Sequence, residues 1–320
     1  MIENKVVTLR CKICEIESEN ELIIVQEKQL GLNDKFEYFV CSKCSCLQIK
    51  DIPENINKYY PPTYYSYQEA KFPSKLNRLN LFLKKSLINY YMGYFEMTGF
   101  LLSFLFDHPF PWIRKKEINF NSKILDVGTG SGRKILSLQR SGFTNLTGID
   151  PFIDKDVYYK NGVKVLKREI SEIDDKYDFI MLHHSFEHMQ NPQQVIKHIS
   201  RLLNSGGCAL IRIPVSNCYA WYKYRENWYG LDAPRHFFLH TPQSINILLE
   251  KTDLKIDEIV FDSVINQFTG SEKNLRNLPF SSPDYNFSKK ELRQFVNEVK
   301  KLNANGQGDQ ACFYLKKNPK

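Results

Sequence analysis

The sequence predicts an α/β protein, in which a parallel sheet carries helices on both faces and a small metal-binding module precedes it. Two observations support this prediction. From Lys123 onward, apolar strand-like runs alternate with helical segments, an order typical of parallel sheets. Five of the eight cysteines fall between Cys11 and Cys46. The chain has 320 residues, 42% of them hydrophobic, which suffices for one large domain and one small one.

The N-terminal module, residues 1–60, is predicted from its cysteines. Two Cys-x-x-Cys pairs lie 26 residues apart: Cys11, Cys14, Cys41 and Cys44. Four thiolates in two tight turns suit a tetrahedral, structural zinc ion, so we expect a zinc-ribbon-like fold with Cys46 outside the ligand set. Residues 35–40 alternate apolar and polar side chains, as a short strand does. The first residues contain no apolar signal segment, so the expected location is the cytoplasm, where disulfides are rare.

Residues 61–118 form a connector in this interpretation. An aromatic, proline-broken stretch at 59–67 leads into a strongly apolar and helical region at 74–118. Its two uncharged runs, 86–95 and 97–106, are both shorter than the ~20 residues that a membrane span needs. We expect these helices to pack on the catalytic sheet. The alternative is a helix lying on a membrane surface, because basic residues flank the runs.

The net charge of +8 is unevenly distributed along the chain. Residues 1–60 contain eight Lys/Arg and ten Asp/Glu, a balance of −2, whereas residues 71–123 contain nine and three, a balance of +6. A module that grips a phosphate backbone is normally basic itself. The acidic balance of the cysteine module therefore disfavours RNA as its partner.

The catalytic domain is expected at residues 119–320. Strands are predicted at 124–127, 146–149, 163–166, 179–182 and 209–213, with two late strands at 256–261 and 311–315. Helices are predicted from about Arg133 and over 192–203, the second ending at the Asn-Ser-Gly-Gly sequence 204–207.

A glycine-rich turn follows the first of these strands. The sequence from Asp126 runs Asp-Val-Gly-Thr-Gly-Ser-Gly, and its three glycines allow positive φ and close approach of the backbone to a ligand. A dinucleotide fingerprint requires a glycine at 133, where this chain has arginine. The loop is therefore poorly suited to a pyrophosphate.

This loop resembles motif I of class I S-adenosylmethionine (SAM)-dependent methyltransferases. The resemblance implies a Rossmann-like, seven-stranded sheet and a loop that cradles the methionine part of SAM. A carboxylate at the end of the second strand can accept both ribose hydroxyls, as in other nucleotide-binding folds, and Asp150 has that place. The residues that we assign to the cofactor are Asp126, Gly128, Gly130, Gly132, Asp150, Glu169, Ile170 and His183, with Glu169 and Ile170 on the adenine side.

The segment after the fourth strand is expected to carry the chemistry. His184, Glu187 and His188 occupy positions i, i+3 and i+4, which share one face if the segment is helical, and His236 lies in a later histidine-rich stretch. We expect a histidine of this set to act as general base toward an acceptor hydroxyl. Two alternatives remain open. One is a divalent ion at His184, Glu187 and His188, of the zinc or manganese type because the ligands are nitrogen-rich; the other is a structural cluster.

Two residues are candidates for binding the acceptor. Arg235 can pair with a phosphate or carboxylate in a bidentate manner, but it can equally form a salt bridge to Asp232. Trp228 can stack on a sugar or a base, but it can equally pack in the core.

The acceptor is predicted from a wider resemblance. The cysteine pairs, the aromatic stretch and Trp228–His236 resemble a group of methyltransferases encoded with bacterial surface-polysaccharide and sugar-modification genes. This implies a sugar acceptor, either nucleotide-linked or part of a glycan, and an inner membrane surface is a second possible partner for the basic connector. No Asn/Asp-Pro-Pro-Tyr/Phe motif follows the fourth strand, so DNA is not expected. The alternatives are an RNA methyltransferase with a zinc module and a non-catalytic SAM-binding protein.

Overall fold

The computed structural model describes residues 6–61, 77–113, 118–159 and 162–318. Its strands are β1 (Val6–Arg10), β2 (Glu17–Gln26), β3 (Lys35–Val40), β4 (Leu47–Ile49), β5 (Lys123–Val127), β6 (Asn145–Ile149), β7 (Val157–Tyr158), β8 (Lys164–Leu166), β9 (Tyr177–His183), β10 (Leu203–Pro214), β11 (Phe238–Leu239), β12 (Leu254–Phe261) and β13 (Gln310–Lys317). Its α-helices are α1 (Arg78–Tyr91), α2 (Met97–Ser103), α3 (Arg133–Arg140), α4 (Pro192–Leu202), α5 (Tyr219–Tyr224), α6 (Pro242–Leu249), α7 (Asn266–Leu275) and α8 (Lys289–Ala304).

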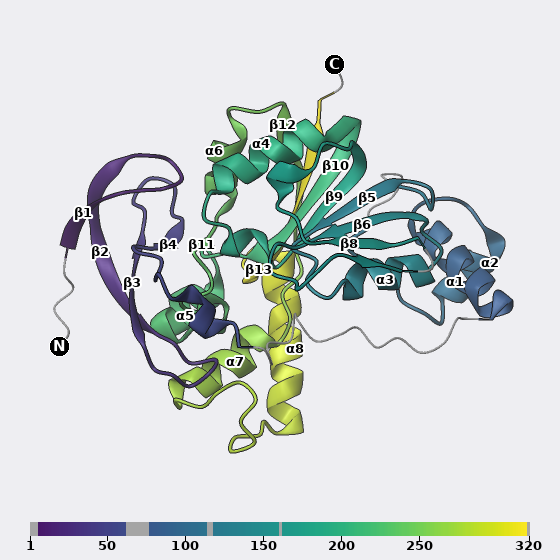
Figure 1. Cartoon of the computed structure of the whole chain (residues 1–320). Helices are drawn as coiled ribbons and strands as arrows, with labels where there is room; N and C mark the ends of the chain where they lie inside the picture. Colours follow the sequence, from purple (N-terminus) through teal and green to yellow (C-terminus); the bar gives the residue numbers. More distant parts are fainter. Residues whose placement is uncertain (1–5, 62–76, 114–117, 160–161, 319–320) are drawn as a thin grey trace.

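The larger sheet has the strand order β12-β13-β10-β9-β5-β6-β8-β7 (Figure 1). The predicted seven-strand count is therefore wrong by one, because the two-residue strand β7 extends the edge next to β8. The sheet is also mixed rather than parallel. β13 runs antiparallel to both of its neighbours, and β7 runs antiparallel to β8. The α/β class and all seven predicted strands of this sheet are confirmed.

Helices cover both faces of this sheet. Along β5, Leu125 and Val127 belong to one buried cluster and Ile124 to the other, as the two-residue period of a strand requires. The first cluster includes the buried apolar residues of α4. The second cluster includes buried apolar residues of α3 and α1. The predicted helix over 192–203 is confirmed as α4, which ends one residue earlier, at Leu202, because β10 begins at Leu203.

The module at the N-terminus is continuous with the catalytic domain. A second sheet has the order β1-β2-β3-β4-β11, so its last strand comes from the C-terminal half of the chain. Tyr38 of β3 is fully buried and donates a hydrogen bond to the carbonyl of His236, 2.9 Å away. One buried cluster spans Tyr38, Leu47 and Phe238. Folding of the module and of the residues near His236 is therefore coupled.

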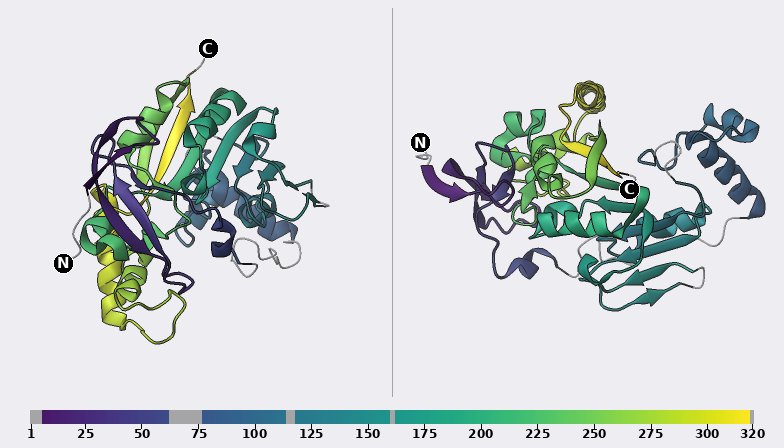
Figure 2. Two further views of the ribbon diagram at one scale, coloured as in Figure 1. Left: turned by 60° about the vertical axis from the view of Figure 1, so that its left-hand side comes forward. Right: turned by 90° about the horizontal axis from the view of Figure 1, so that it is seen from above.

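The two helices of the connector lie at the other end of the molecule. Figures 1 and 2 show α1 and α2 next to α3 and far from β1–β3. The predicted long helical region consists of these two helices, separated by a turn at 92–96. Ile88 and Met92 pack in the cluster that contains α3, which agrees with the expectation that the region packs on the sheet. The predicted aromatic stretch lies largely outside the described residues.

Candidate active site

The site lies where the sheet order changes direction. From β5 the chain first adds β6 and β8 on one side and then β9 and β10 on the other. Crevices at the carboxyl ends of strands at such a switch point bind ligands in open α/β sheets. The segment after β5 is the glycine-rich loop, and the segment after β9 begins at His184. The two predicted functional segments therefore meet at this edge.

The geometry of the glycine-rich loop requires its glycines. Gly128, Gly130 and Gly132 all have positive φ, between 54° and 76°. A Cβ on Gly128 would lie 2.4 Å from the Cβ of Ser185, whose hydroxyl donates to the carbonyl of Val127 at 2.8 Å. The exit of β9 is thus packed directly against the loop, and a side chain at 128 would separate them.

Two buried carboxylates flank the loop. Asp126 is 2% exposed and accepts a hydrogen bond from the Thr129 hydroxyl; burial raises its pKa to about 6. Asp150 accepts bonds from the backbone N–H groups of Gly130 (2.8 Å) and Phe152 (2.9 Å), and burial raises its pKa. A cradle of backbone N–H groups with two carboxylates fits a ligand that carries an ammonium group and ribose hydroxyls.

The other residues assigned to the cofactor lie around this loop. Glu169 caps a 3₁₀ turn with its exposed side chain, and Ile170 is largely buried in the core. His183 ends β9 and contacts the ring of Trp112 edge-on, with centroids 4.6 Å apart. Neither of its ring nitrogens has a hydrogen-bond partner among the described residues. The cofactor roles of all three stay predictions.

Four predicted catalytic residues come together after β9. His184 has φ +52°, and the segment 186–188 forms a 3₁₀ turn rather than an α-helix. Glu187 is fully buried, and His184 Nδ1 lies 3.5 Å and His236 Nε2 3.9 Å from its Oε1. Burial raises the pKa of Glu187, but the neighbouring histidines outweigh it and bring the pKa to about 2. The carboxylate is therefore ionised at neutral pH.

Backbone carbonyls hold two of the histidines. His188 Nδ1 lies 2.7 Å from the carbonyl of Arg235, and His236 Nδ1 lies 2.8 Å from that of Gly230. A carbonyl only accepts, so Nδ1 carries the proton in both rings and Nε2 has the free lone pair. Burial lowers the pKa of His188, which favours its neutral form.

The structure corrects both acceptor-binding assignments. Arg235 is 2% exposed; its Nε and Nη2 donate to the Asp232 carboxylate and its Nη1 to the carbonyl of Tyr59. The salt-bridge alternative thus describes Arg235. Trp228 is 1% exposed and donates from Nε1 to Asp309 at 3.0 Å, so the core-packing alternative describes it. Both side chains are fixed by partners within the chain.

Sequence reasoning missed residues that contact the site from elsewhere. Tyr60, at the end of the N-terminal module, places its hydroxyl 3.2 Å from His188 Nδ1. Arg212 of β10 donates to His184 Nε2 at 3.1 Å. Trp112 and Ser185 contact His183 and the glycine-rich loop, as described above. Tyr60 lay in the aromatic sequence that begins at Tyr59, and Ser185 lay in the segment after the fourth strand, whereas Trp112 and Arg212 carried no such signal.

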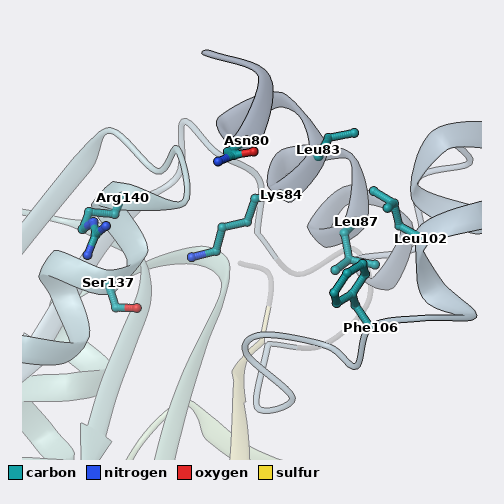
Figure 3. A pocket seen from close by; sticks show the side chains of 8 residues that line it. All are labelled: Asn80, Leu83, Lys84, Leu87, Leu102, Phe106, Ser137 and Arg140. Carbon is teal, nitrogen blue, oxygen red and sulfur yellow. The ribbon is translucent and has the colours of Figure 1, made fainter. Parts of the chain in front are cut away.

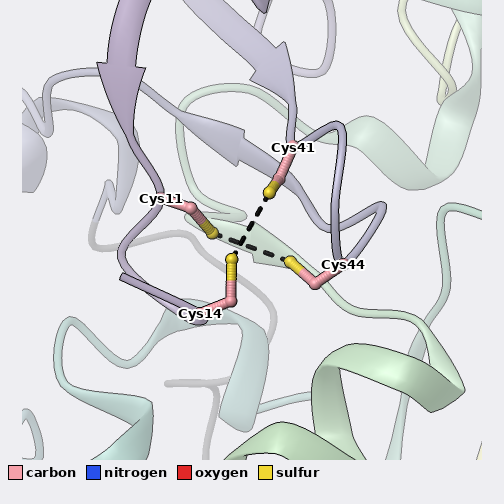
Figure 4. Close-up of side chains that lie close together, drawn as sticks. All are labelled: Cys11, Cys14, Cys41 and Cys44. Atoms are coloured by element: carbon pink, nitrogen blue, oxygen red, sulfur yellow. Dashed lines mark hydrogen bonds between the residues drawn. The ribbon is translucent and has the colours of Figure 1, made fainter. Parts of the chain in front are cut away.

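The four predicted metal ligands of the module converge (Figure 4). Cys11 and Cys44, and likewise Cys14 and Cys41, have Sγ atoms 3.6 Å apart, and all four lie within 4.8 Å of one another. Zn–S bonds of ~2.3 Å in a tetrahedron place sulfurs about 3.8 Å apart. The Gln48 amide and the Ile13 N–H donate to Cys11 Sγ, which favours a thiolate. The cluster therefore fits zinc, and Cys46 lies outside it.

A cavity of about 370 Å³ lies between α1, α2 and α3 (Figure 3). It reaches Ser137 and Arg140 at the C-terminal end of α3, whereas the glycine-rich loop is at the N-terminal end of that helix. This cavity is therefore separate from the cofactor loop. Among the described helices, none combines the length and apolar character needed to cross a bilayer.

Comparison with known proteins identifies the family of the catalytic domain. A methyltransferase-domain family model matches residues 95–259. The ubiquinone biosynthesis O-methyltransferase of Rickettsia bellii is 29% identical over 152 residues, or 43% of this chain and 63% of the relative. That of Rickettsia conorii is 30% identical over 168 residues, or 47% and 58%. The chain thus spans less than two thirds of the length of these relatives.

Solved methyltransferase structures are also similar. A SAM-dependent methyltransferase of Thermotoga maritima covers 75% of this chain and 94% of its own at 14% identity, with a TM-score of 0.41. An O-methyltransferase of a Brevibacillus brevis polyketide synthase covers 63% and 69% at 21% identity, with a TM-score of 0.39.

The fold, the glycine-rich loop and its carboxylates are those of a SAM-binding methyltransferase domain. Because the family model covers more than half of the 320 residues, the chain belongs to the methyltransferase-domain family. SAM is its cofactor.

Proposed function

We propose that this enzyme transfers the SAM methyl group to a hydroxyl of a small-molecule acceptor, most specifically a sugar that is nucleotide-linked or part of a glycan. The observation that carries the proposal is the set His184, Glu187, His188 and His236, which gathers beside the glycine-rich loop at the sheet's switch point. The O-methyltransferases among its relatives act in ubiquinone biosynthesis, and they support hydroxyl chemistry.

The residues present fit an in-line transfer. The glycine-rich loop with Asp126 and Asp150 would hold SAM, which would supply an electrophilic methyl carbon; an acceptor oxygen attacking that carbon would displace the sulfur as the C–S bond breaks. The acceptor proton leaves to the histidine cluster, in which buried Glu187 stabilises positive charge. His188 is the more exposed of the two histidines with a free Nε2, and it is the residue we assign as the nearest to the acceptor.

The cysteine cluster supports a structural zinc ion in this proposal. Its four thiolates hold together β-strands of a module whose sheet continues into β11, and β11 follows His236 directly. Zinc therefore acts on the site through positioning and takes no part in the transfer.

The helical pair α1–α2 supports a peripheral membrane contact. Phe95, Phe104 and Leu105 are 86%, 71% and 77% exposed, and Arg78 is exposed on the same pair of helices. Apolar side chains with basic neighbours favour an anionic lipid surface. Such a contact would bring the enzyme to a lipid-linked glycan.

The acceptor class is tested by transfer of labelled methyl from SAM into cell extract, separated into small soluble, lipid-extractable and RNA fractions. Label in the soluble or lipid fraction, released as a methylated sugar on hydrolysis, is expected. Label in RNA would favour the RNA alternative, and SAM binding with no labelled product would favour a non-catalytic role.

A further inference from the structure

The strongest unexplained feature of the molecule is the pairing of Glu187 with His188 and His236. Glu187 has no exposed surface, and neither of its carboxylate oxygens accepts a hydrogen bond from the part of the chain that the structure describes. A buried carboxylate without hydrogen bonds is costly, so it requires a cation. The groups around it decide which cation.

His236 faces Glu187 with a lone pair, because its Nε2 lies 3.9 Å from Glu187 Oε1, and His188 belongs to the same cluster. Because Nδ1–H of each ring is donated to a backbone carbonyl, the neutral rings leave only Nε2 for a ligand. One ligand atom from each of Glu187, His188 and His236 lies within 4.8 Å of the others. Three potential ligand atoms are therefore clustered together at Glu187.

His184 is excluded from this set by its own hydrogen bonds. Arg212 donates to His184 Nε2 at 3.1 Å, so Nδ1 carries the proton and faces Glu187 at 3.5 Å. Asp232 is excluded as well. It lies 3.7 Å from His236 Nε2, but both of its oxygens accept from Arg235. The sequence spacing suggested His184, Glu187 and His188 as metal ligands. Glu187 and His188 remain in the set, and His236 replaces His184.

We propose that Glu187, His188 and His236 bind a divalent metal ion of the Mn²⁺ or Zn²⁺ class, separate from the cysteine site. Two imidazoles and one carboxylate suit such ions and leave coordination positions open. Carbonyls that fix Nδ1 orient metal-binding histidines in this way. Metal–ligand bonds of about 2.1 Å require ligands about 3 Å apart, so the 3.9 Å between Glu187 Oε1 and His236 Nε2 must shorten by less than 1 Å.

The open positions suit oxygen ligands of an acceptor. This step rests on the proposed function: a hydroxyl bound to the ion would lose its proton to solvent more readily, and the oxygen would then attack the SAM methyl carbon while the C–S electron pair returns to sulfur. In the metal-bound enzyme the ion would take over the deprotonating role given to the histidine cluster above, and His188 and His236 would act as its ligands.

Mn²⁺ is the probe, because thiolates bind it poorly and the cysteine site can stay loaded with zinc. The full chain is titrated with Mn²⁺ and followed by the electron paramagnetic resonance of the free ion, without SAM or acceptor. One site per chain is expected. Glu187→Gln and His188→Gln should each weaken binding at least tenfold with zinc content and circular dichroism unchanged. His198→Gln, a change on α4 outside the cluster, should bind as the unaltered chain does.

Absence of Mn²⁺ binding, or equal binding by the Glu187→Gln and His188→Gln variants, would overturn the site. If Glu187→Gln fails to fold, His188→Gln decides, because His188 is only partly buried. Methyl transfer is measured separately on metal-depleted and Mn²⁺-loaded enzyme. A metal-bound protein that transfers methyl equally well without the ion would overturn the catalytic step alone, whereas failure to transfer methyl at all would count against the proposed function and not against the site.

Discussion

At the scale of single residues, function depends on a few buried charges. Asp126, Asp150 and Glu187 all lie within a short distance of the switch point of the sheet, and all are less than a tenth exposed. Each costs free energy to bury. Asp126 accepts from the Thr129 hydroxyl and Asp150 from two backbone N–H groups, whereas Glu187 has no hydrogen bond among the described residues. Ligands with ammonium, hydroxyl or metal character are the natural partners.

The raised pKa of Asp126 predicts a pH dependence of cofactor binding. A cationic ammonium group prefers the ionised carboxylate, and the pKa of Asp126 in the free protein is about 6 because of burial. As the pH falls through 6, a proton competes with the ligand, so SAM affinity should fall by up to about tenfold per pH unit. Calorimetric titration between pH 5 and 7 measures this. Asp126→Asn should bind more weakly at pH 7 and show a flatter profile; a flat profile for the unaltered enzyme would refute the assignment.

Replacement of Arg235 is expected to lower the stability of the protein and not its affinity for the acceptor. Arg235→Ala leaves the Asp232 carboxylate without its guanidinium partner, and breaking a buried pair from one side costs about 3–5 kcal/mol. Urea unfolding should show a decrease of that order. Arg235→Lys, which keeps the charge but not the two-pronged geometry, should lose less. Unchanged stability with a raised acceptor KM would restore Arg235 to the acceptor site.

At the scale of elements, the connection from β5 to α3 is set by backbone conformation. Gly128→Ala places a Cβ 2.4 Å from Ser185 Cβ at φ +73°. The expected result is a loss of SAM affinity of more than tenfold, since the loop must move away from β9. Gly206→Ala is the matched control. It has nearly the same φ, +72°, with no atom within 4 Å, so it should lose about 1–2 kcal/mol of stability and keep SAM affinity, measured by the same titration.

The zinc module predicts that metal removal destabilises the catalytic domain. Its sheet ends in β11, so loss of the ion should disorder both parts. Cys14→Ser, or a chelator, should remove about one zinc per chain and lower the melting temperature of a single cooperative transition. Cys46→Ser should retain zinc, because Cys46 lies outside the cluster. Two independent transitions after chelation would show that the module is energetically separate.

At the scale of the whole molecule, the helical pair α1–α2 predicts vesicle binding. The exposed Phe104 and Leu105 side chains would enter the interface of a bilayer. Each apolar group that is buried there adds to the free energy of membrane binding. The enzyme should sediment with vesicles rich in anionic lipid. Phe104→Glu with Leu105→Glu should reduce the bound fraction several-fold and leave methyl transfer to a soluble acceptor unchanged. If this variant sediments with vesicles as much as the unaltered enzyme does, the α1–α2 surface is not the membrane-binding surface.

The sequence determined the class of fold and the cofactor loop by itself. Seven strands of the larger sheet were predicted, as were Asp126, the glycines and the four clustered cysteines, because period, glycine spacing and cysteine spacing are local signals. The two-residue strand β7 and the antiparallel direction of β13 were not predictable, since edge pairing depends on partners far along the chain.

Tertiary structure alone decided the roles of the side chains that are paired. An arginine or a tryptophan can contact either an acceptor or a buried carboxylate, so residue type alone does not give the roles of Arg235 and Trp228. Their hydrogen bonds to Asp232 and Asp309 in the folded chain give them structural roles. The spacing of His184, Glu187 and His188 suggested one helical face. The segment is a 3₁₀ turn instead, the bond from Arg212 leaves His184 without a free lone pair, and His236 Nε2 lies closer to Glu187 than the sequence spacing implied. Hydrogen-bond direction fixes which nitrogen has a lone pair, and that direction depends on carbonyls and side chains that only the folded chain brings together.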